Sequence, residues 1–428
     1  MRESDLRATK RFKVSAGEDQ VMEEREQVVS MTDLQQFSDD GDGSSSSLLS
    51  GLPEELAMEC LARVSSLGSL RGVSKSWQKL VYSTYFQQLR VQYGRTELSW
   101  VYTLVQSTRD GSFKWQAYDP FSSQWHDLPP VPHVMDFQLS NPGCIGLSYS
   151  VQCASTRTKL VMIAAMKLRE SHGSPSPCKP RGVVMLEPAL ERPLIFDPAQ
   201  RLWKRGSCFR VPRKWCVCGV ADEKIYVASG SGKDWDRDVS KSAEVYDHEK
   251  DVWQRLNNLS SSKFSGEAMS AVTQGGKLYI ASGRGVFQRE GAVYTPSTGL
   301  WTKMEPGLRK GWTGSCVSVK GKFYVVDDTA GKLKVYAPER EEWTVFMEDS
   351  RLKNLESIVS TGDGKLCGIV CTPPSEDGSK PGCSKGNLIR VVDVEAQPAP
   401  LIFDIQVPGD GQAVALQVLS MMNSDIQT

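Results

Sequence analysis

The sequence predicts a mainly β fold: a six-bladed β-propeller preceded by a small α-helical domain. Three observations predict it. An aromatic residue is followed seven positions later by tryptophan, and this step occurs five times. Turn-forming residues separate the two aromatics, and the steps recur at intervals of 78, 50, 48 and 42 residues. A four-stranded repeat of about 40 to 50 residues is the size of a propeller blade. The pairs are Tyr118 and Trp125, Phe196 and Trp203, Tyr246 and Trp253, Tyr294 and Trp301, and Tyr336 and Trp343.

Each step is predicted to be a β-hairpin. Asp119 and Pro120, for example, follow Tyr118. Proline has no N–H for a strand ladder and aspartate caps its own turn, so the strand ends there and the tryptophan begins the next one. Two further strands are expected upstream, because residues 224–230 and 277–283 match closely and 322–326 is a third copy.

The blades are expected in chain order, with the ring closed by the C-terminus. Blade one shows only three strands, near 98–106, 113–118 and 124–128, and a strand at 413–419 has no blade of its own. Unpaired sheet edges invite aggregation. We therefore expect this last strand to take the inner position of blade one. The other blades are predicted at about 143–208 (with an insertion at 167–192), 215–258, 268–305, 314–347 and, in degenerate form, 357–405.

The region before the propeller divides in two. Residues 1–47 contain eleven acidic and six basic residues and end in a Gly/Ser-rich run, so a disordered tail is predicted. Residues 48–94 are predicted to be helical, at about 52–64, 67–73, 74–82 with Ser74 as a cap, and 84–93. In the first helix Leu56, Cys60, Leu61 and Val64 are expected to form one apolar stripe. About 45 residues bury little core of their own, so this domain should lean on another surface. The propeller is assigned to residues 95–420.

Composition and residue spacing exclude several classes of function. The chain has 51 basic and 51 acidic residues and no apolar run near 18 residues. We therefore expect neither nucleic-acid nor membrane binding, and no signal peptide. The four histidines lack metal-binding spacing, Cys216 and Cys218 have no matching second pair, and the phosphate-loop-like Gly230 to Lys233 is followed by Asp234. We expect no cofactor, no metal and no catalytic residue. The eleven cysteines form no regular framework, which favours a reducing compartment, cytoplasm and/or nucleus.

Two resemblances indicate the family. The segment from Leu52-Pro53-Glu54-Glu55-Leu56, through Leu61-Ala62-Arg63-Val64, to Val73-Ser74-Lys75-Ser76-Trp77 looks like an F-box. The glycine after the second strand and the Tyr…Trp step resemble kelch repeats, whereas the Gly-His and Trp-Asp marks of WD40 blades are missing. The order of the two is similar to the plant F-box/kelch-repeat family. The short junction at 65–70 departs from the family by lacking basic or aromatic residues.

The resemblance implies a substrate-recognition subunit of an SCF ubiquitin ligase. Its F-box would bind the Skp adaptor, and through it a cullin, while the propeller would hold a protein target for ubiquitination and degradation. Such a subunit is not an enzyme. The residues expected on the adaptor-binding surface are apolar: Leu52, Pro53, Leu56, Leu61, Leu70, Val73 and Trp77.

A target-binding face is predicted from strand direction. Antiparallel strands put the loops between second and third strands on the same side as the linkers between blades. Bases beside aromatics recur in those linkers, and both are enriched at binding hot spots. Duplicated blades also keep similar loops without any function, so ancestry is the alternative explanation. The residues predicted to contact the target are Arg213, Trp215, Lys263, Phe264, Arg309, Lys310, Trp312 and Lys353.

Two other functions stay open at this point. One is a kelch-propeller enzyme with a helical extension, and the other is a propeller scaffold whose F-box-like region binds only its own domain. A non-catalytic substrate receptor is the leading hypothesis.

Overall fold

The structure is a computed structural model of the whole chain. It describes residues 48–64, 70, 73–93, 99–110, 112–120, 122–132, 151–169, 185–188, 190–233, 236, 238–260, 269–282, 290–371 and 386–419. The predicted disordered tail and the predicted boundary at 94/95 lie outside these residues. By its contacts the chain divides into two compact units, Met1–Met58 and Glu59–Thr428.

Three helices precede the propeller: α1 (Glu54–Ala62), α3 (Lys75–Tyr82) and α4 (Thr84–Gln92). Ser74 caps α3 as predicted, because its hydroxyl accepts a hydrogen bond from the Trp77 N–H at 3.1 Å. Ser83 does the same for the Phe86 N–H at 3.3 Å and so begins α4. The predicted helix at 67–73 lies mostly outside the described residues.

A buried arginine satisfies carbonyls at the end of α1. The Arg90 guanidinium, on α4, donates to the carbonyl oxygens of Ala62 at 3.2 Å and Val64 at 2.7 Å. The last carbonyls of a helix have no partner within the helix, and a cation is favourable there. Arg90 therefore ties the C-terminal end of α1 to α4.

The apolar stripe predicted for α1 is wrong in part. Leu61 is buried, but Leu56 and Cys60 are exposed and Val64 is half-buried. The buried positions are instead Ala57, Met58, Leu61 and Ala62. The small residues Ala57 and Ala62 occupy the inner face, which leaves the larger Leu56 outside.

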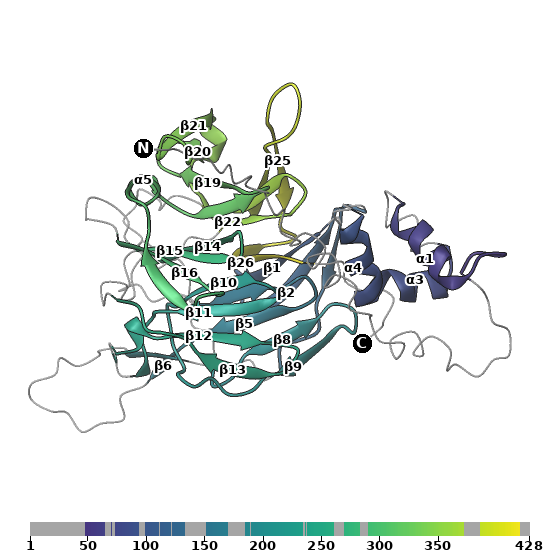
Figure 1. Cartoon of the computed structure of the whole chain (residues 1–428), viewed down its shortest axis with the longest axis horizontal. Coiled ribbons are helices and arrows are strands. Elements are labelled where there is room, and N and C mark those ends of the chain that lie inside the picture. Colours follow the sequence, from purple (N-terminus) through teal and green to yellow (C-terminus); the bar gives the residue numbers. More distant parts are fainter. Residues whose placement is uncertain are drawn as a thin grey trace, which may run out of the picture. The chain divides into compact units, whose positions relative to one another are not determined.

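The described residues form six four-stranded antiparallel sheets, each a propeller blade (Figure 1). Strand order from inside to outside follows the chain in blades three to six and skips an insertion in blade two. Blade one is β26 (Gly411–Leu419), β1 (Trp100–Ser107), β2 (Phe113–Asp119) and β3 (Gln124–Asp127). Blade two is β4 (Gln152–Ser155), β5 (Leu160–Ala164), β8 (Leu194–Asp197) and β9 (Leu202–Arg205).

The remaining four blades are meanders of consecutive strands. Blade three is β10 (Val217–Ala221), β11 (Lys224–Ala228), β12 (Ala243–Asp247) and β13 (Val252–Arg255). Blade four is β14 (Met269–Gln274), β15 (Lys277–Ser282), β16 (Glu290–Thr295) and β17 (Leu300–Lys303). Blade five is β18 (Cys316–Val319), β19 (Lys322–Asp327), β20 (Lys332–Ala337) and β21 (Glu342–Glu348). Blade six is β22 (Leu355–Ser360), β23 (Lys365–Val370), β24 (Leu388–Asp393) and β25 (Leu401–Gln406).

The insertion in blade two contains structure that the sequence did not predict. Strands β6 (Met166–Arg169) and β7 (Met185–Pro188) pair with each other as a separate two-stranded sheet. The remainder of the insertion, 170–184 and 189, lies outside the described residues.

The inner strands stand side by side in a closed ring. β26 lies next to β4, followed in turn by β10, β14, β18 and β22, which returns to β26. Apolar clusters fill the spaces between neighbouring blades. Between blades six and one, for example, Val105 and Leu416 pack with Ile389 and Val391. Burial of such side chains is the main force that holds blade to blade.

Each of the five tryptophans lies directly opposite its aromatic partner. Tyr246 and Trp253 are register partners with stacked rings whose centroids are 4.7 Å apart. The other four pairs are also register partners, with tilted rings and centroids 5.0 to 5.4 Å apart. Each indole N–H also donates to a backbone carbonyl in the linker that enters its blade or, for Trp125, to that of Gln406, the last residue of the preceding blade's outer strand. The acceptors are the carbonyls of Gln406, Pro129, Ser207, Asn257 and Leu308, at 2.8 to 3.1 Å. Each tryptophan thus joins its blade to the one before it.

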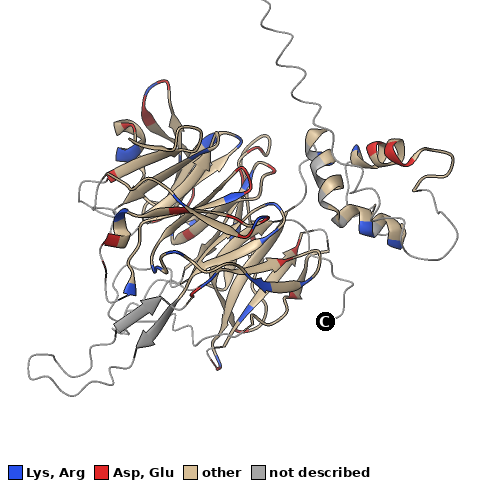
Figure 2. Ribbon diagram, turned by 60° about the horizontal axis from the view of Figure 1, so that its bottom comes forward, with Lys and Arg blue, Asp and Glu red and all other residues tan. Residues whose placement is uncertain are grey.

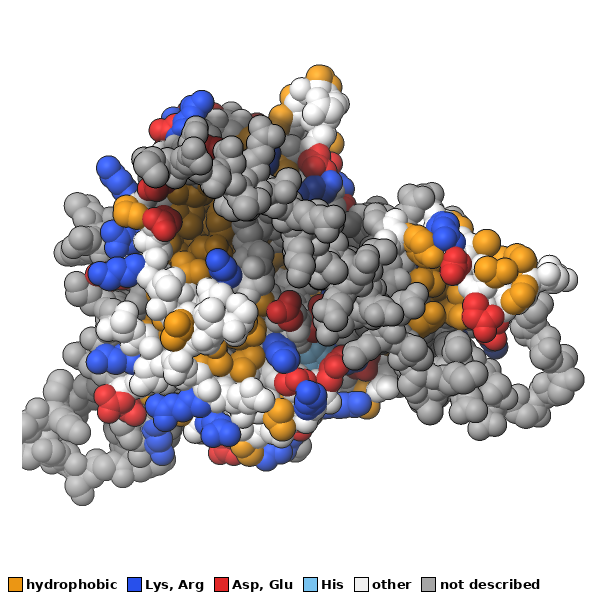
Figure 3. Space-filling model, in the orientation of Figure 1, with side chains coloured by type: hydrophobic (Ala, Val, Ile, Leu, Met, Phe, Trp, Pro, Cys, Tyr) orange, Lys and Arg blue, Asp and Glu red, His pale blue; other side chains and the backbone are white. Residues whose placement is uncertain are grey.

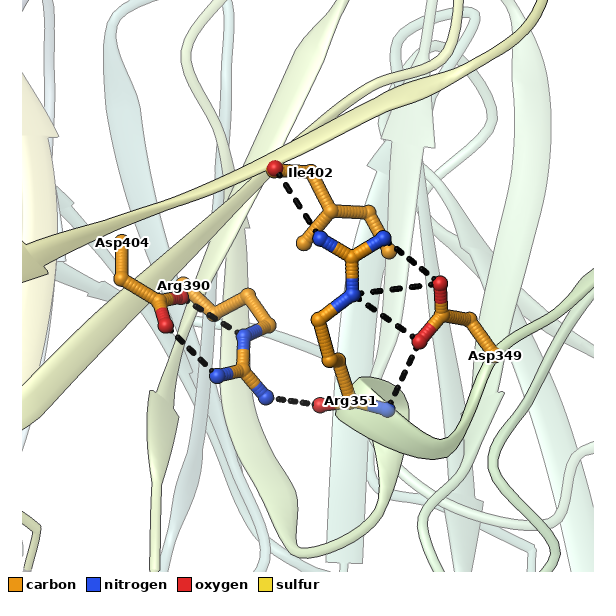
Figure 4. Close-up of polar contacts among 5 residues, drawn as sticks. All are labelled: Asp349, Arg351, Arg390, Ile402 and Asp404. Carbon is orange, nitrogen blue, oxygen red and sulfur yellow. Dashed lines mark hydrogen bonds and ion pairs between the residues drawn. The ribbon is translucent and has the colours of Figure 1, made fainter.

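Blade six makes the equivalent contact with arginine (Figure 4). Its register partners at the aromatic positions are Val392 and Ile402. Arg390, on β24, donates to the backbone carbonyl of Arg351 in the entering linker and holds both oxygens of Asp404 at 2.7 Å. The Arg351 guanidinium in turn donates to the Ile402 carbonyl at 3.3 Å. A bidentate guanidinium–carboxylate pair fixes Arg390 where the other blades use an indole.

The predicted closure of the ring is confirmed. β26 pairs antiparallel with β1 from Trp100 opposite Leu419 to Ser107 opposite Gly411. The Thr103 hydroxyl donates to the Ala415 carbonyl at 3.0 Å. Val414 and Leu416 are buried, as are Ala413 and Ala415, so both faces of the strand are covered. The last described strand therefore supplies the inner edge of the first blade.

A chain that ends at Asp410 should lose the folded propeller. Its β1 would have an unpaired inner edge, and each buried backbone group without a partner costs about 1–3 kcal/mol. That loss over one strand approaches the ~5–15 kcal/mol stability of a typical domain. We expect aggregation or a much lower Tm, measured by size-exclusion chromatography and thermal unfolding. A chain that ends at Leu419 is the control and should behave like the full chain; equal behaviour of both truncations would contradict closure by β26.

Candidate protein-binding surfaces

The residues predicted to bind the adaptor fall into two groups. Leu52, Leu56 and Val73 are exposed large apolar side chains, at 39, 49 and 58% exposure, and Pro53 is also exposed. Trp77 is half-buried, whereas Leu61 and Leu70 are buried. The buried pair can support a binding surface but offers little area to a partner. The exposed group supplies apolar surface that the protein itself does not cover, and such surface is typical of a protein-interaction site.

The linkers between blades and the loops between second and third strands share one face, as strand direction predicts. Lys214, in the linker into blade three, forms a bridge with Ser231 in two backbone hydrogen bonds of 2.9 Å. In the linker into blade six, the Asp349 N–H donates to the Gly331 carbonyl at 3.0 Å. We call this side of the propeller the linker face.

Arg213 lies on the linker face but is buried. Its guanidinium donates to the carbonyls of Ser229 at 3.0 Å and Ser242 at 3.2 Å, and it lies 3.6 Å from the Glu244 carboxylate. Both side chains of this ion pair are 2% exposed. Burial raises the pKa of Glu244 above its ordinary value, and the nearby arginines, Arg213 first, offset part of the rise. Arg213 therefore holds the loops of blade three together from inside.

Two of the predicted hot-spot tryptophans are also buried. Trp215, 7% exposed, has φ of 55° and lies beneath the Lys214 ammonium, which is 5.0 Å from its ring centroid. Trp312, 3% exposed, packs near Phe323 with ring centroids 6.3 Å apart. The sequence-based assignment of these side chains to an exposed surface does not match their burial. Each precedes an inner strand by only a few residues, so the neighbouring blades cover it.

The linker into blade five presents its bases on a short helix, α5 (Pro306–Gly311). This helix sits against β21, and a Cβ on Gly311 would lie 2.0 Å from the Trp343 ring, so only glycine fits there. Lys310 is exposed and Arg309 is half-buried. A helix held this closely presents its side chains at a fixed position.

The linker into blade six adds one further exposed base, Lys353. Beside it, Arg351 is held by Asp349, whose carboxylate accepts from its guanidinium at 2.7 Å. Hydrogen bonds from Arg351 lower the pKa of Asp349, so the pair stays ionised. Lys263 and Phe264, also predicted to bind the target, lie outside the described residues.

Charge over the propeller is mixed. Figure 2 shows Lys and Arg positions interspersed with Asp and Glu positions across the blades. The prediction from the sequence nevertheless missed one regular feature. A base lies two residues after the tryptophan in three consecutive blades: Arg205, Arg255 and Lys303. The spacing of the repeat contains this signal, but the predicted binding residues were chosen from the linkers and not from the outer strands.

Metal ligands and reactive thiols are the remaining candidate chemical groups among the described residues. No group of three or more His, Cys, Asp or Glu among them is arranged to hold a metal ion. The eight described cysteines are free, and burial raises the pKa of Cys367 to about 12. A thiol with that pKa stays protonated and packs as a small apolar group. In this part of the chain, no helix is both long and apolar enough to cross a membrane.

Comparison with known proteins places the chain in a class and then in a family. The Kelch motif family matches residues 212–260, which include the four strands of blade three, so the propeller is of the kelch type. The F-box/kelch-repeat protein SKIP25 of Arabidopsis thaliana is 30% identical over 88% of this chain and 91% of its own length. The chain belongs to the F-box/kelch-repeat family.

More distant relatives carry the same description. The F-box/kelch-repeat protein SKIP4 of Arabidopsis thaliana is 26% identical over 76% of this chain and 84% of its own length. Among solved structures, the structure of YjhT matches with a TM-score of 0.43 and 12% identity, over 71% of this chain and 91% of that one. The blade count rests on the strand pairing described above.

Replacing Arg213 should destabilise the propeller. Arg213→Met leaves Glu244 buried without its cation, and breaking a buried pair costs about 3–5 kcal/mol. The double variant Arg213→Met/Glu244→Met should recover part of that loss, because no unpaired charge remains. Thermal unfolding of wild type, single and double variants measures this. Lys310→Met, at an exposed base, is the control and should change stability by less than about 0.5 kcal/mol; a similar small effect at Arg213 would show that its contacts are not structural.

Proposed function

We propose that this protein is the substrate-recognition subunit of an SCF-type ubiquitin ligase. The helical segment binds the Skp adaptor and, through it, a cullin, and the propeller holds a target protein for ubiquitination. The observation that carries the proposal is the union, in one F-box/kelch-repeat chain, of a helical segment with exposed apolar side chains and a closed kelch propeller. The subunit itself performs no chemistry. It raises the local concentration of the target at the ligase.

The adaptor contact is supported by the exposure of Leu52, Leu56 and Val73. Large apolar side chains gain about 25 cal/mol for each Å² of apolar area that a partner removes from water. Leu61 and Leu70 are buried, and Ser74, the residue after Val73, caps the start of α3.

The target contact is supported by the exposed bases of the linker face. Lys310 on α5 and Lys353 in the next linker are exposed, Arg309 on α5 is half-buried, and none of the three forms an ion pair with a described residue. Arg213, Trp215 and Trp312 support the loops from below. We assign the target-binding surface to the first three residues and a supporting role to the buried three.

A kelch-propeller enzyme remains the alternative, with a scaffold bound only to itself as the third hypothesis. Among the described residues, no group of side chains is arranged to hold a metal ion, and burial raises the pKa of the Cys367 thiol to about 12, so neither feature supports a catalytic site. The cysteine content also leads us to propose the cytoplasm and/or the nucleus as the compartment.

Changing the exposed apolar start of the helical segment should abolish adaptor binding. Leu52→Ala/Pro53→Ala removes apolar area at residues whose side chains are exposed, so folding should be unaffected. We expect loss of retention on an immobilised Skp adaptor with an unchanged Tm.

The matched control is Leu300→Ala/Val345→Ala, which trims exposed apolar side chains on the propeller by a similar amount. It should retain the adaptor. Full retention by the Leu52/Pro53 variant, or no retention by the folded wild-type chain, would count against the receptor function.

Charge reversal on α5 should weaken target capture. Arg309→Glu/Lys310→Glu places two acids where the linker face now presents two bases. Proximity labelling in cells, with and without proteasome inhibition, identifies proteins that accumulate near the wild-type chain only when degradation is blocked. We expect the variant to lose most of that set while it keeps the adaptor and its Tm.

Lys277→Glu/Lys322→Glu is the control for that experiment. These two exposed lysines begin second strands and lie on the opposite face of the ring. If this control loses the same proteins, or if the α5 variant loses none, the linker face is not where the target binds.

A further inference from the structure

The outer strands carry charges that separate by sector around the ring. The position two residues after each tryptophan is opposite Leu194, Glu244 and Ala292 in blades two, three and four, and a base occupies it each time: Arg205, Arg255 and Lys303. In blades six and one, the equivalent residues are acids, Asp404 and Asp127. Blade five has Val345 there.

The acids are neutralised and the bases are not. Asp404 is held by Arg390 at 2.7 Å, and Asp127 accepts from Lys114 at 3.3 Å and from Gln116 at 2.7 Å. Arg205, Arg255 and Lys303 are exposed and, within the described residues, form no ion pair. Arg255 makes only a 3.5 Å contact with the Asn258 side-chain oxygen. Three neighbouring blades therefore present exposed cations without an ion pair, although the buried Glu244 lies opposite Arg255 in the sheet and attracts it.

Exposed aliphatic side chains begin the same three outer strands, at the end away from the bases. The residue before each tryptophan is Leu202, Val252 and Leu300 in the same three blades, at 51, 41 and 55% exposure. Lys204 adds a fourth exposed base beside Leu202. Figure 3 shows Lys and Arg side chains with apolar ones between them along the lower edge, over β9 and β13. We call Leu202, Arg205, Val252, Arg255, Leu300 and Lys303 the basic rim.

The bases of the rim adjoin the linker face, whereas Leu202, Val252 and Leu300 begin the outer strands at the other end. An outer strand ends where the linker to the next blade begins, and each base is the last residue of β9, β13 or β17. A target held at α5 in the linker that follows blade four thus lies next to Lys303. The rim continues the exposed cations of the linker face outward across blades two to four.

We propose that the basic rim binds an acidic, aliphatic-bearing extended segment of the target protein. This inference rests on the proposed function, and it names the class of target. Glutamate or aspartate side chains meet the three unpaired bases, and apolar side chains cover Leu202, Val252 and Leu300. Complementary charge also speeds encounter and selects partners by charge.

A protein segment fits the rim better than a nucleic acid. Proteins that hold single strands stack bases on exposed aromatic rings. Trp203 and Trp253 do not offer such rings, because they are 6 and 5% exposed. Trp301 is half-buried, and the N–H groups of all three tryptophans donate to the preceding linkers. Exposed aliphatic side chains occur on the same strands instead.

The test uses a defined peptide and the full chain bound to its Skp adaptor. The probe is a fluorescein-labelled 16-residue peptide, Glu-Leu-Glu-Ser repeated four times, which spans about 50 Å when extended. Fluorescence anisotropy gives its Kd at 50 mM salt and again at 500 mM, where screening shortens the reach of surface charge. We expect saturable binding that weakens at least tenfold at high salt, and little binding of the same peptide with Gln for Glu.

Two triple variants with the same change in net charge locate the site. Arg205→Glu/Arg255→Glu/Lys303→Glu should weaken peptide binding at least tenfold with an unchanged Tm. Lys224→Glu/Lys277→Glu/Lys322→Glu alters three exposed lysines that begin second strands on the opposite face, and it should bind within twofold of wild type.

Several results would overturn the proposal. Equal effects of the two triple variants would mean a response to net charge alone, and no effect of the rim variant would place the peptide elsewhere. Equal binding of the Gln peptide would remove the role of charge, and tighter binding of a labelled 16-nucleotide oligouridylate would indicate a nucleic-acid surface. Adaptor retention is measured on the same samples, so failure of the rim leaves the receptor function standing and failure of the receptor function is seen separately.

Discussion

Every tryptophan of the repeat donates its indole N–H to a backbone carbonyl at or just after the end of the preceding blade's outer strand, and the order of the ring depends on this contact. A partly buried N–H without an acceptor is costly, so the linker carbonyl must stay where the indole reaches it. The aromatic partner one strand inward fixes the indole plane. The linker is thereby held to the sheet that follows it. The loops of the linker face are fixed as a result. Blade six keeps the constraint and changes the donor, since Arg390 reaches the linker carbonyl and Asp404 holds Arg390.

The two proposed binding regions differ in how they are built. The helical segment holds its shape with small contacts, such as the Ser74 cap and the Arg90 tie to α1, and leaves Leu52, Leu56 and Val73 exposed. The linker face holds its shape with buried charge and aromatic packing, and leaves Lys310 and Lys353 exposed. In both regions the buried residues position the exposed ones.

Much of this architecture could be predicted because it is repeated. The spacing of Tyr and Trp located five blades, and the surplus strand at 413–419 located the closure, since both signals lie in short stretches of sequence. Burial at Arg213, Trp215 and Trp312 could not be predicted in the same way. Their residue types suit a binding surface, but their exposure depends on neighbouring blades far away in the chain. The prediction of which face of α1 is buried was also wrong in part, because the small residues Ala57 and Ala62 are buried and the larger Leu56 is exposed.

The pairing of β26 with β1 also sets an order of events during synthesis. About 300 residues separate Ser107 from its partner Gly411. At typical elongation rates of about 5–20 residues per second, β1 waits roughly 15–60 s for that partner. During this interval the helical segment is already made, whereas the ring still has an open inner edge. The propeller, with its linker face, is therefore complete only after β26 is made, long after the helical segment.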